Sequence, residues 1–457
     1  MASFFKPSFL RRISFGLDDK PPNPWRFPAQ SYYDLTPPSE FSELDVEVKT
    51  QESKTLHAPA ASHVTVDEEP LVAVIGVGYV GEQLVALFSK CFRVLGYDVS
   101  AARTKELQIS FRGNDNARFT NWAGDIAAAT HFLISVPTLL LPDKTVDTSF
   151  LRAALAAVRS HARRGAVVVI ESSVAVGMTR EFLGPLAEKG GLFAGMSPER
   201  VDPGRAEPPA KSIPKIISGL DDVIPRSLDA IRALYERVFD CVVAVSSTEV
   251  AEMTKLYENC QRMVCIAYAN EMADACRSLG IDPFEVCDAA STKPFGYLPF
   301  RPGLGVGGHC IPVNPHYLLL NGEFPLLRDA TERMRQRPSV IAQRAVKKLY
   351  TASTQLVLLP TVLVVGIGFK PGQAHLANSP GLALAKSLAL TGLVDVAWID
   401  PLVAQEAVPQ IPRLDMHRWT ATALESFDMI IVAFRQRGLD FGVLEKLQGV
   451  DVEMWCP

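Results

Sequence analysis

A single cysteine, Cys310, lies between a run of glycines and two prolines. Residues 305–309 read Gly-Val-Gly-Gly-His, and residues 311–315 read Ile-Pro-Val-Asn-Pro. Glycines such as Gly307 have no side chain, so a substrate can approach the sulfur closely. Prolines fix φ and stiffen the chain that follows. A cysteine taken alone is more often a buried core residue, but this loop suits an accessible nucleophile.

Three more side chains could work with such a nucleophile. Lys255 and Asn259 are four residues apart, so on a helix they share a face and could aim a cation and an amide at one substrate oxygen. Glu199 lies in the segment Met-Ser-Pro-Glu-Arg-Val-Asp-Pro-Gly at 196–204, where its carboxylate could act as a base or orient a water. Each has a plainer interpretation: a polar helix surface for the first two, and a solvated loop carboxylate for Glu199.

The helix that carries Lys255 is the strongest one predicted in the chain. Ser246 and Glu249 have the spacing of a capping box, and Gly280 fits the position just after a helix end. A helix over 248–279 is about 48 Å long at roughly 1.5 Å per residue. Such a helix can connect two domains and offer a face for dimerisation.

A glycine fingerprint follows the first apolar strand. Residues 71–75 are a continuous apolar run, typical of a parallel strand buried on both faces. Gly76 allows a tight turn, Gly78 lets backbone approach a pyrophosphate, and Gly81 permits close packing of the next helix. The second strand ends at Asp98, whose carboxylate can accept hydrogen bonds from ribose hydroxyls and repels a 2′-phosphate. Together they predict a Rossmann domain that binds NAD.

Two further buried strands end in small polar residues. The apolar run 131–136 is followed by Pro137 and Thr138, and the run 166–170 is followed closely by Ser173. In an open parallel sheet, ligands bind at the carboxyl ends of strands, so Thr138 and Ser173 are placed where a nicotinamide or substrate would lie. Ordinary turn chemistry at strand ends is the alternative.

The same strand pattern returns in the last quarter of the chain. The run 361–365 is followed by Gly-Ile-Gly at 366–368 and then by Lys370. Two more apolar runs, 394–399 and 429–434, have the character of parallel strands. This pattern predicts a second Rossmann-like domain that lacks the third glycine of the fingerprint.

The expected fold class is α/β, with two Rossmann-like doubly wound parallel sheets joined by a long central helix and a helical middle domain. We expect a disordered extension at 1–68, because it is rich in Pro, Ser and acidic residues without periodicity. The NAD-binding domain is expected over 69–247. The central helical domain, with the Cys310 loop, is expected over 248–348, and the second Rossmann-like domain over 349–457.

Composition excludes several other classes of protein. The chain has 457 residues and a net charge of −4, which gives no basis for nucleic-acid binding. Its eight cysteines are scattered without metal-ligand spacing, which predicts no metal site and a reducing, cytoplasmic location. No apolar run is long enough to predict a membrane span.

Taken together, these motifs resemble the UDP-glucose/GDP-mannose dehydrogenase family, from about residue 70 onwards. The signatures occur in the following order: Gly76-x-Gly78-x-x-Gly81 with Asp98, Val136-Pro137-Thr138, Glu171-Ser172-Ser173, Ser197-Pro198-Glu199-Arg200, Lys255-x-x-x-Asn259, Gly307-Gly308-His309-Cys310, and Lys370-Pro371 with Ser379-Pro380. Because several separate motifs occur in the order expected for the family, chance agreement is a poor explanation.

The resemblance implies a four-electron oxidation of a sugar C6 alcohol to a carboxylate by two NAD⁺. After the first oxidation gives an aldehyde, Cys310 would add to it, and oxidation of the thiohemiacetal would give a thioester that water hydrolyses. Lys255 and Asn259 would stabilise the developing oxyanion. Glu199 and Ser173 would hold or activate water.

The resemblance also implies a set of binding residues. Cofactor contacts are implied for Gly76, Gly78, Tyr79, Val80, Gly81, Asp98, Arg103, Pro137, Thr138, Ser173 and Lys370. Substrate contacts are implied for Glu199, Arg200, Lys255, Asn259, Arg301 and Gly307. Arg301 would reach the substrate across a subunit interface, so a homodimer or higher homo-oligomer is expected. Residues 349–457 would bind the nucleotide sugar.

Two details resemble one branch of the family. Cys310 is followed by Ile-Pro-Val rather than Phe-Pro-Lys, and the loop after Glu199 reads Arg-Val-x-Pro-Gly. Both resemble enzymes that oxidise UDP-N-acetylglucosamine or UDP-N-acetylmannosamine. A UDP-glucose 6-dehydrogenase is the alternative within the family.

Four positions depart from the family pattern. Asn314 stands where the family usually has Asp, and an amide cannot accept a proton at neutral pH. Ser173 replaces the usual Thr, a mild change. His375 and Ala377 replace the usual Asp and Arg, and losing one charge-assisted contact to the cofactor costs roughly 1.5–3 kcal/mol. A weakly active or non-catalytic nucleotide-sugar-binding member is therefore a second interpretation.

Overall fold

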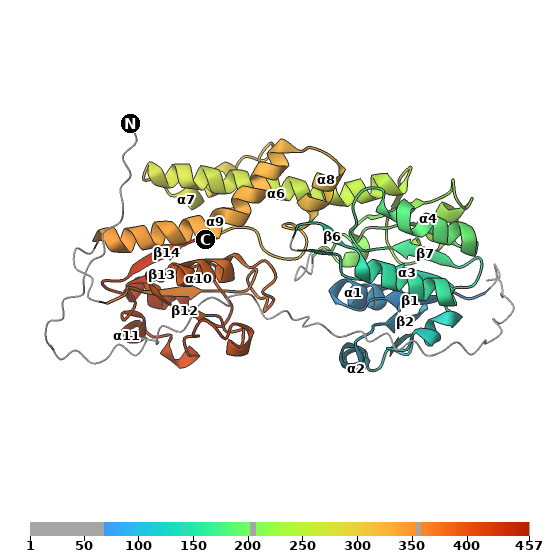
Figure 1. Ribbon diagram of the computed structural model, residues 1–457, viewed down its shortest axis with the longest axis horizontal. Coiled ribbons are helices and arrows are strands. Elements are labelled where there is room, and N and C mark those ends of the chain that lie inside the picture. The colour runs from blue at the N-terminus through green and yellow to red at the C-terminus, as the bar shows by residue number, and fades with distance from the viewer. Residues whose placement is uncertain (1–67, 142, 202–206, 353–357, 457) are drawn as a thin grey trace, which may run out of the picture.

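The computed structural model describes residues 68–141, 143–201, 207–352 and 358–456. Two α/β units lie at opposite ends of an elongated molecule, and long helices run along one side between them (Figure 1). Of the extension predicted at the N-terminus, only Glu68 lies within the described residues. Its carboxylate pairs with Arg163 at 2.6 Å.

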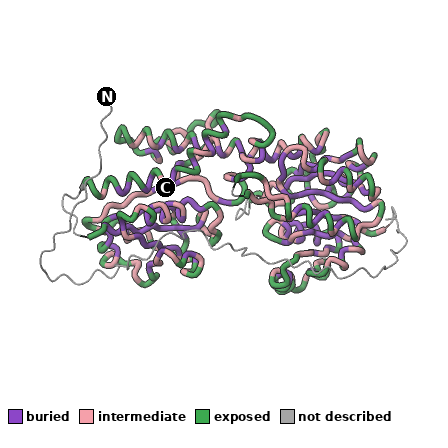
Figure 2. Tube along the Cα trace, viewed as in Figure 1, coloured by how far each residue is buried: buried purple, intermediate pink, exposed green. Residues whose placement is uncertain are grey.

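The first unit is built on an eight-stranded sheet in the order β10-β9-β8-β7-β4-β1-β2-β3. Its strands are β1 (Leu71–Ile75), β2 (Arg93–Tyr97), β3 (Ala117–Thr120), β4 (His131–Ile134), β7 (Val167–Ile170), β8 (Phe193–Met196), β9 (Lys215–Gly219) and β10 (Val242–Ala244). A short hairpin, β5 (Leu139–Leu140) and β6 (Val146–Asp147), stands apart from this sheet. The central strands are buried on both faces, as their continuous apolar sequences predict (Figure 2).

Helices cover both faces of this sheet and enclose two hydrophobic clusters. They are α1 (Tyr79–Phe88), α2 (Ala101–Ser110), α3 (Ser149–His161), α4 (Met178–Gly190) and α5 (Ser227–Tyr235). This is the doubly wound arrangement predicted from the sequence.

The sheet differs from the expectation at one side, where it is not parallel. β9 pairs antiparallel with β8, and β10 runs parallel to β9. The carboxyl ends of β1, β4, β7 and β8 therefore share one edge of the sheet with the beginning of β9. Residues that enter β9 and residues that leave β7 and β8 are brought together there.

The second unit contains a four-stranded parallel sheet in the order β12-β11-β13-β14. Its strands are β11 (Thr361–Val365), β12 (Asp395–Ile399), β13 (Met429–Val432) and β14 (Asp451–Met454). Helices α10 (Pro380–Leu390) and α11 (Ala421–Leu424) contribute to the two layers that cover it. The predicted second Rossmann-like sheet is present, with β14 as an additional strand at its edge.

The two units are connected by α6 (Thr248–Ser278), α7 (Pro283–Ser291), α8 (Asn314–Asn321) and α9 (Pro325–Ala352). The bounds of α6 agree with the predicted helix within one residue. Its cap is one residue later than predicted: the hydroxyl of Ser247, not Ser246, accepts the Val250 N–H. Glu249 instead pairs with Arg180 at 2.6 Å, which ties α6 to α4.

Trp455 anchors the second unit to these long helices. The guanidinium groups of Arg277 on α6 and Arg337 on α9 lie 3.7 and 5.2 Å from the centre of its ring. Arg337 also forms an ion pair with Asp274 of α6 at 2.7 Å. Cation–π contacts in a desolvated setting add to apolar packing, so α6 and α9 hold the second sheet in place through its last strand.

Candidate active site

The glycine turn after β1 has the shape of a pyrophosphate site. Gly76 has φ +85°, which favours glycine, and a Cβ on Gly81 would lie 1.9 Å from the Gly76 carbonyl oxygen. A Cβ on Gly78 would meet no atom within 4 Å, so there is open space beside it. Helix α1 begins at Tyr79 without a side-chain cap. Its first N–H groups are thus available to an anion, and these residues fit a dinucleotide.

Asp98 braces this turn. One carboxylate oxygen accepts the Val77 N–H at 3.0 Å, and the other accepts the Ser100 N–H at 2.9 Å. A carboxylate has about four acceptor sites, so both oxygens retain capacity for ribose hydroxyls.

Arg103 lies on the same turn. Its Nε donates to the carbonyl oxygen of Val77 at 2.9 Å, and its guanidinium pairs with Glu82 and Glu106 at 2.5 and 2.9 Å. Tyr79 is 43% exposed at the start of α1, whereas Val80 packs against the sheet. Direct contacts of these residues with a cofactor remain a prediction.

The ends of β4 and β7 lie next to each other, because the two strands pair in parallel. The Ser172 hydroxyl donates to the Val136 carbonyl at 2.7 Å, and the Tyr317 hydroxyl of α8 donates to the Thr138 carbonyl at 2.8 Å. Pro137 is exposed, while Thr138 and Ser173 are half-buried. The central helices therefore approach the edge of the sheet where a nicotinamide is expected.

Lys255 and Asn259 do not form a polar surface stripe. They are 7% and 0% exposed on the face of α6 that turns inward. The Asn259 amide donates to the amide oxygen of Asn314, and Arg262 donates to the Asn259 oxygen. Arg262 was not predicted; it is one turn beyond Asn259, which is the signal that could have found it.

Cys310 is exposed, and the chain around it is held at several points. Its carbonyl oxygen accepts the N–H groups of Val313 and Asn314 at 3.2 and 2.9 Å, at the start of α8. Burial lowers the pKa of Lys255, and the neighbouring Cys310 and Glu199 act against that lowering. The structure thus brings the cysteine, the lysine and the Asn259–Asn314 amide pair together.

The glycines before Cys310 pack on the second unit. A Cβ on Gly307 would lie 3.0 Å from side-chain atoms of both Phe369 and Pro380. The Gly308 N–H donates to the carbonyl oxygen of Ala377 at 2.9 Å. The glycine run is therefore required by the close approach of the loop after β11, in addition to leaving the sulfur accessible.

Glu199 is not a solvated loop carboxylate. Its side chain is 9% exposed, and one oxygen bonds the Lys215 ammonium at 2.8 Å. The other oxygen accepts the N–H groups of Arg200 and Val201 at 2.6 and 2.9 Å. Arg200 pairs with Glu258 of α6 at 2.5 Å. The proline and glycine at 203–204, in the same sequence motif, lie outside the described residues.

Two further predicted binding residues contact neighbouring side chains of this chain. Arg301 pairs with Asp288 of α7. The Lys370 ammonium lies 5.6 Å from the centre of the Phe369 ring, in the loop after β11. Their contacts with substrate and cofactor stay predictions.

Two kinds of feature are absent from the described part of the chain. No helix there has the length and apolarity to cross a bilayer. Among the same residues, no group of three or more His, Cys, Asp or Glu side chains is placed to hold a metal ion.

The fold and the glycine turn define a dinucleotide-binding α/β protein with a helical connection between two sheets. Residues 71–239 match the NAD binding domain of the UDP-glucose/GDP-mannose dehydrogenase family, and residues 249–326 match its central domain. The chain belongs to this family. It is therefore an NAD-dependent nucleotide-sugar dehydrogenase, as the motifs predicted.

Several curated relatives are similar over most of their length. The UDP-N-acetyl-D-glucosamine 6-dehydrogenase of Pseudomonas aeruginosa is 34% identical, over 73% of this chain and 83% of that protein. The UDP-N-acetyl-D-mannosamine dehydrogenase of Pyrococcus horikoshii is 30% identical, over 73% of this chain and 84% of that protein. A solved structure of the P. horikoshii enzyme has a TM-score of 0.73 at 25% identity, covering 84% of this chain and 99% of that chain.

Proposed function

We propose that this enzyme oxidises the C6 alcohol of a UDP-N-acetylhexosamine to the carboxylate through a thioester on Cys310. The observation that supports this most is the grouping of an exposed thiol with the buried amino group of Lys255 and the Asn259–Asn314 amide pair. A thiol beside a cation is more readily ionised and is a good nucleophile toward an aldehyde.

The side chains divide the chemistry as follows. NAD⁺, which the glycine turn after β1 would hold, would supply the hydride acceptor for each of the two oxidations. Lys255, whose pKa burial lowers, takes the proton of the C6 hydroxyl and then stabilises the oxyanion formed when the Cys310 thiolate adds to the aldehyde carbon. Water then attacks the thioester carbon, the carbon–sulfur bond breaks, and the carboxylate leaves as Cys310 recovers its thiolate.

Asn314 gives this chain a different division of roles from relatives with Asp. Its oxygen accepts from Asn259, so it orients the amide that faces the oxyanion. Since an amide cannot take up a proton at neutral pH, Lys255 takes the proton of the attacking water, after it has released the C6 proton to solvent. Ser173, half-buried at the end of β7, is proposed to hold that water.

A UDP-N-acetylhexosamine is preferred as substrate for two reasons. The curated relatives described above are named for UDP-N-acetylglucosamine and UDP-N-acetylmannosamine. Cys310 is also followed by Ile-Pro-Val, as in that branch. We further propose that the second sheet, with Lys370 in its first loop, binds the nucleotide.

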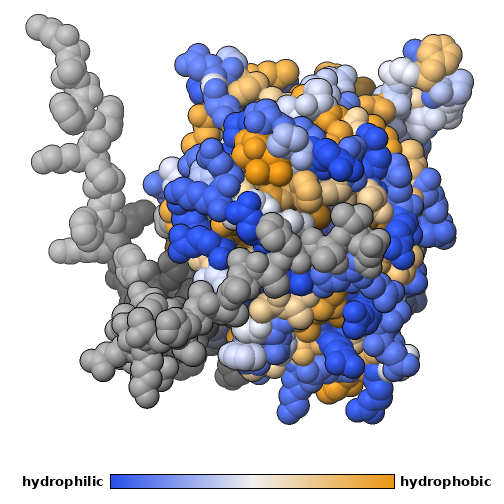
Figure 3. Space-filling view, turned by 90° about the vertical axis from the view of Figure 1, so that its right-hand side faces the viewer, coloured by the Kyte–Doolittle hydropathy of each residue, from blue (hydrophilic) through white to orange (hydrophobic). Residues whose placement is uncertain are grey.

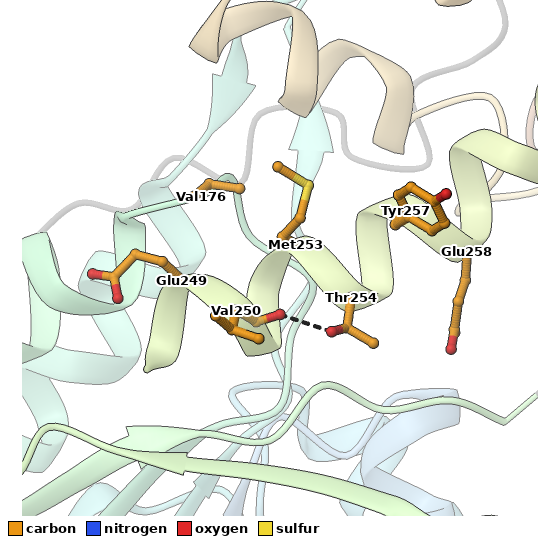
Figure 4. Close-up of a pocket in the computed structure, with 7 residues that line it drawn as sticks. All are labelled: Val176, Glu249, Val250, Met253, Thr254, Tyr257 and Glu258. Carbon is orange, nitrogen blue, oxygen red and sulfur yellow. Dashed lines mark hydrogen bonds between the residues drawn. The ribbon is translucent and has the colours of Figure 1, made fainter. Parts of the chain in front are cut away.

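We propose that the functional unit is a homodimer formed through α6. Several apolar side chains of α6 are exposed, among them Tyr257 (69%), Tyr268 (64%) and Met272 (45%). Near its start they line an open hollow, shown in Figure 4, whose residues are Val176, Glu249, Val250, Met253, Thr254, Tyr257 and Glu258. By contrast, the end of the molecule formed by the first unit is mainly hydrophilic with small apolar patches (Figure 3).

The test of the thioester step is Cys310→Ser, assayed with UDP-N-acetylglucosamine and UDP-N-acetylmannosamine. A serine hydroxyl stays protonated and is a weak nucleophile, and an alkoxide is a poor leaving group, so we expect the variant to make no uronic acid. Cys91→Ser, at an exposed cysteine of the first unit, is the matched control and should retain activity. Full uronic acid formation by the Cys310 variant would rule out the covalent step.

A further inference from the structure

Lys215 joins two carboxylates that leave the first sheet from neighbouring strands. Its ammonium donates to Glu171 Oε2 at 2.6 Å and to Glu199 Oε2 at 2.8 Å. The three side chains are 2%, 0% and 9% exposed. Lys215 reaches both carboxylates because β9 is antiparallel to β8, so its first residue lies at the edge where β7 and β8 end.

Glu199 depends on Lys215 for its charge. Burial raises the pKa of Glu199, but the Lys215 ammonium and the N–H groups of Arg200 and Val201 outweigh burial and hold it below its usual range. Lys215 donates to Glu199 Oε2, whereas both backbone donors bond the other oxygen. Without the ammonium, a carboxylate this buried takes up a proton at a higher pH.

Glu171 is the carboxylate of the cluster that can be protonated near neutral pH. One ammonium faces two carboxylates, and burial raises the pKa of Glu171 to about 7, with Lys215 acting against it. The hydroxyl of Tyr235 on α5 donates to Glu171, and the ring of Phe239 lies 5.4 Å from the Lys215 nitrogen. Near neutral pH Glu171 can therefore hold the extra proton, and the Lys215 charge is then matched by Glu199.

The Glu199 loop is fastened to the helix that carries Lys255. The guanidinium of Arg200 bonds both oxygens of Glu258, at 2.5 and 3.4 Å. Glu258 is one turn beyond Lys255 on α6, so this pair fixes the loop close to the lysine.

Four charged or titratable groups face Lys255. Cys310, Glu199 and Glu258 favour its ammonium form, whereas Arg262 and burial oppose it. Of the carboxylates, Glu199 is the one held by a buried partner. A change in the charge of Glu199 should therefore alter the pKa of Lys255.

We infer that Lys215 is a positioning residue: it holds Glu199 as a carboxylate beside Lys255 and thereby supports the ammonium that stabilises the Cys310 thiolate. The catalytic part of this role rests on the proposed thioester chemistry. The electrostatic part does not, because it predicts the ionisation of a thiol in the enzyme without substrate.

The test is the rate at which iodoacetamide alkylates Cys310 between pH 5.5 and 9.5, read on the Cys310 peptide by mass spectrometry. We expect Lys215→Met to raise the midpoint of this profile by roughly half a unit or more. Lys211→Met removes the same charge from a surface pair with Asp240, at 52% exposure, and should leave the midpoint unchanged. An unshifted midpoint in folded Lys215→Met would overturn the inference.

A second variant covers the case in which Lys215→Met does not fold. The double variant Lys215→Met/Glu171→Gln removes the Lys215–Glu171 pair together and keeps an amide oxygen for Tyr235, so Glu199 is the one carboxylate of the cluster left without its ammonium. It should show the same upward shift in the alkylation midpoint. An unshifted midpoint in the folded double variant, even with lower enzyme activity, would assign Lys215 a purely structural role.

Discussion

The side-chain amide of Asn378 donates a hydrogen bond of 2.9 Å to the carbonyl oxygen of Gly308, two residues before Cys310. The Gly308 N–H donates in return to the carbonyl oxygen of Ala377 at 2.9 Å. The loop after β11 in the second sheet therefore holds the cysteine loop from one side, while Asn259 of α6 reaches Asn314 from the other. The cysteine loop is therefore held between the second unit and α6.

Asn378→Gly should make the loop that carries Cys310 more mobile without changing the conformation of the loop after β11. Asn378 has φ +48°, a conformation that glycine adopts freely, so the substitution removes little except the hydrogen bond. We expect a loss of about 1 kcal/mol in the free energy of unfolding, faster alkylation of Cys310 and a several-fold lower kcat.

Asn116→Ala is the matched control for Asn378→Gly. Asn116 donates the same kind of bond, 2.9 Å to the Ser89 carbonyl, within the first unit. This variant should lose similar stability and leave Cys310 alkylation unchanged. Equal alkylation rates in both variants and the wild type would show that Asn378 does not position the thiol.

Asn314→Asp should move the acid limb of the pH–rate profile to higher pH. Burial lowers the pKa of Lys255, and a new carboxylate beside it raises that pKa by roughly one unit. Because the proposed mechanism needs Lys255 without its proton, activity at low pH should fall. The measurement is kcat against pH; Asn314→Leu, which removes the acceptor for Asn259, should instead lower kcat at every pH. An unmoved acid limb in the Asp variant would argue against Lys255 as the base.

Tyr268→Glu should dissociate the proposed dimer. Tyr268 is 64% exposed on α6, and a buried unpaired charge at an interface weakens association by roughly 2 kcal/mol or more. Sedimentation velocity should show a shift toward monomer. Ile109→Glu on α2, at a side chain 60% exposed on the first unit, should leave the assembly intact. A wild-type monomer at micromolar concentration would contradict the prediction.

His131 should make the first unit less stable in acid. Burial lowers its pKa from 6.5 to about 4, so its neutral form is favoured in the folded state. This contribution is fully present above the unfolded pKa of about 6.5. It is lost as pH falls toward 4, by at most about 3 kcal/mol.

His131→Asn provides the comparison for this pH dependence. Asparagine does not titrate, so urea unfolding should show a smaller drop in stability between pH 7 and pH 4.5 for the variant than for the wild type. Parallel pH dependence in the two proteins would mean that His131 does not titrate on unfolding.

The features predicted correctly from the sequence are those that depend on residues close together in the chain. The turn at Gly76 and Gly78 needs particular backbone conformations that glycine adopts. Helix α6 needs apolar residues at helical spacing over a long stretch. Both could therefore be located without a structure. The Ser247 cap was missed by one residue because Ser246 and Ser247 are adjacent and only the backbone geometry distinguishes them.

The features missed depend on contacts between distant segments. Lys215 begins β9, a strand that was not predicted from the sequence, and its role follows from the antiparallel pairing of β9 with β8. For the same reason, Glu199 read alone resembled a solvated carboxylate. Asn378 contacts Gly308 across 70 residues, and no local pattern signals such a contact.

The most direct test of the account is the number of NADH molecules formed per sugar when the purified full chain acts on a limiting amount of nucleotide sugar. UDP-N-acetylglucosamine, UDP-N-acetylmannosamine, UDP-glucose and GDP-mannose would be compared. We predict two NADH per sugar with a UDP-N-acetylhexosamine. A single NADH per sugar would contradict the thioester mechanism, and no NADH from protein that binds NAD⁺ would point to the non-catalytic alternative and to Asn314 and Ala377.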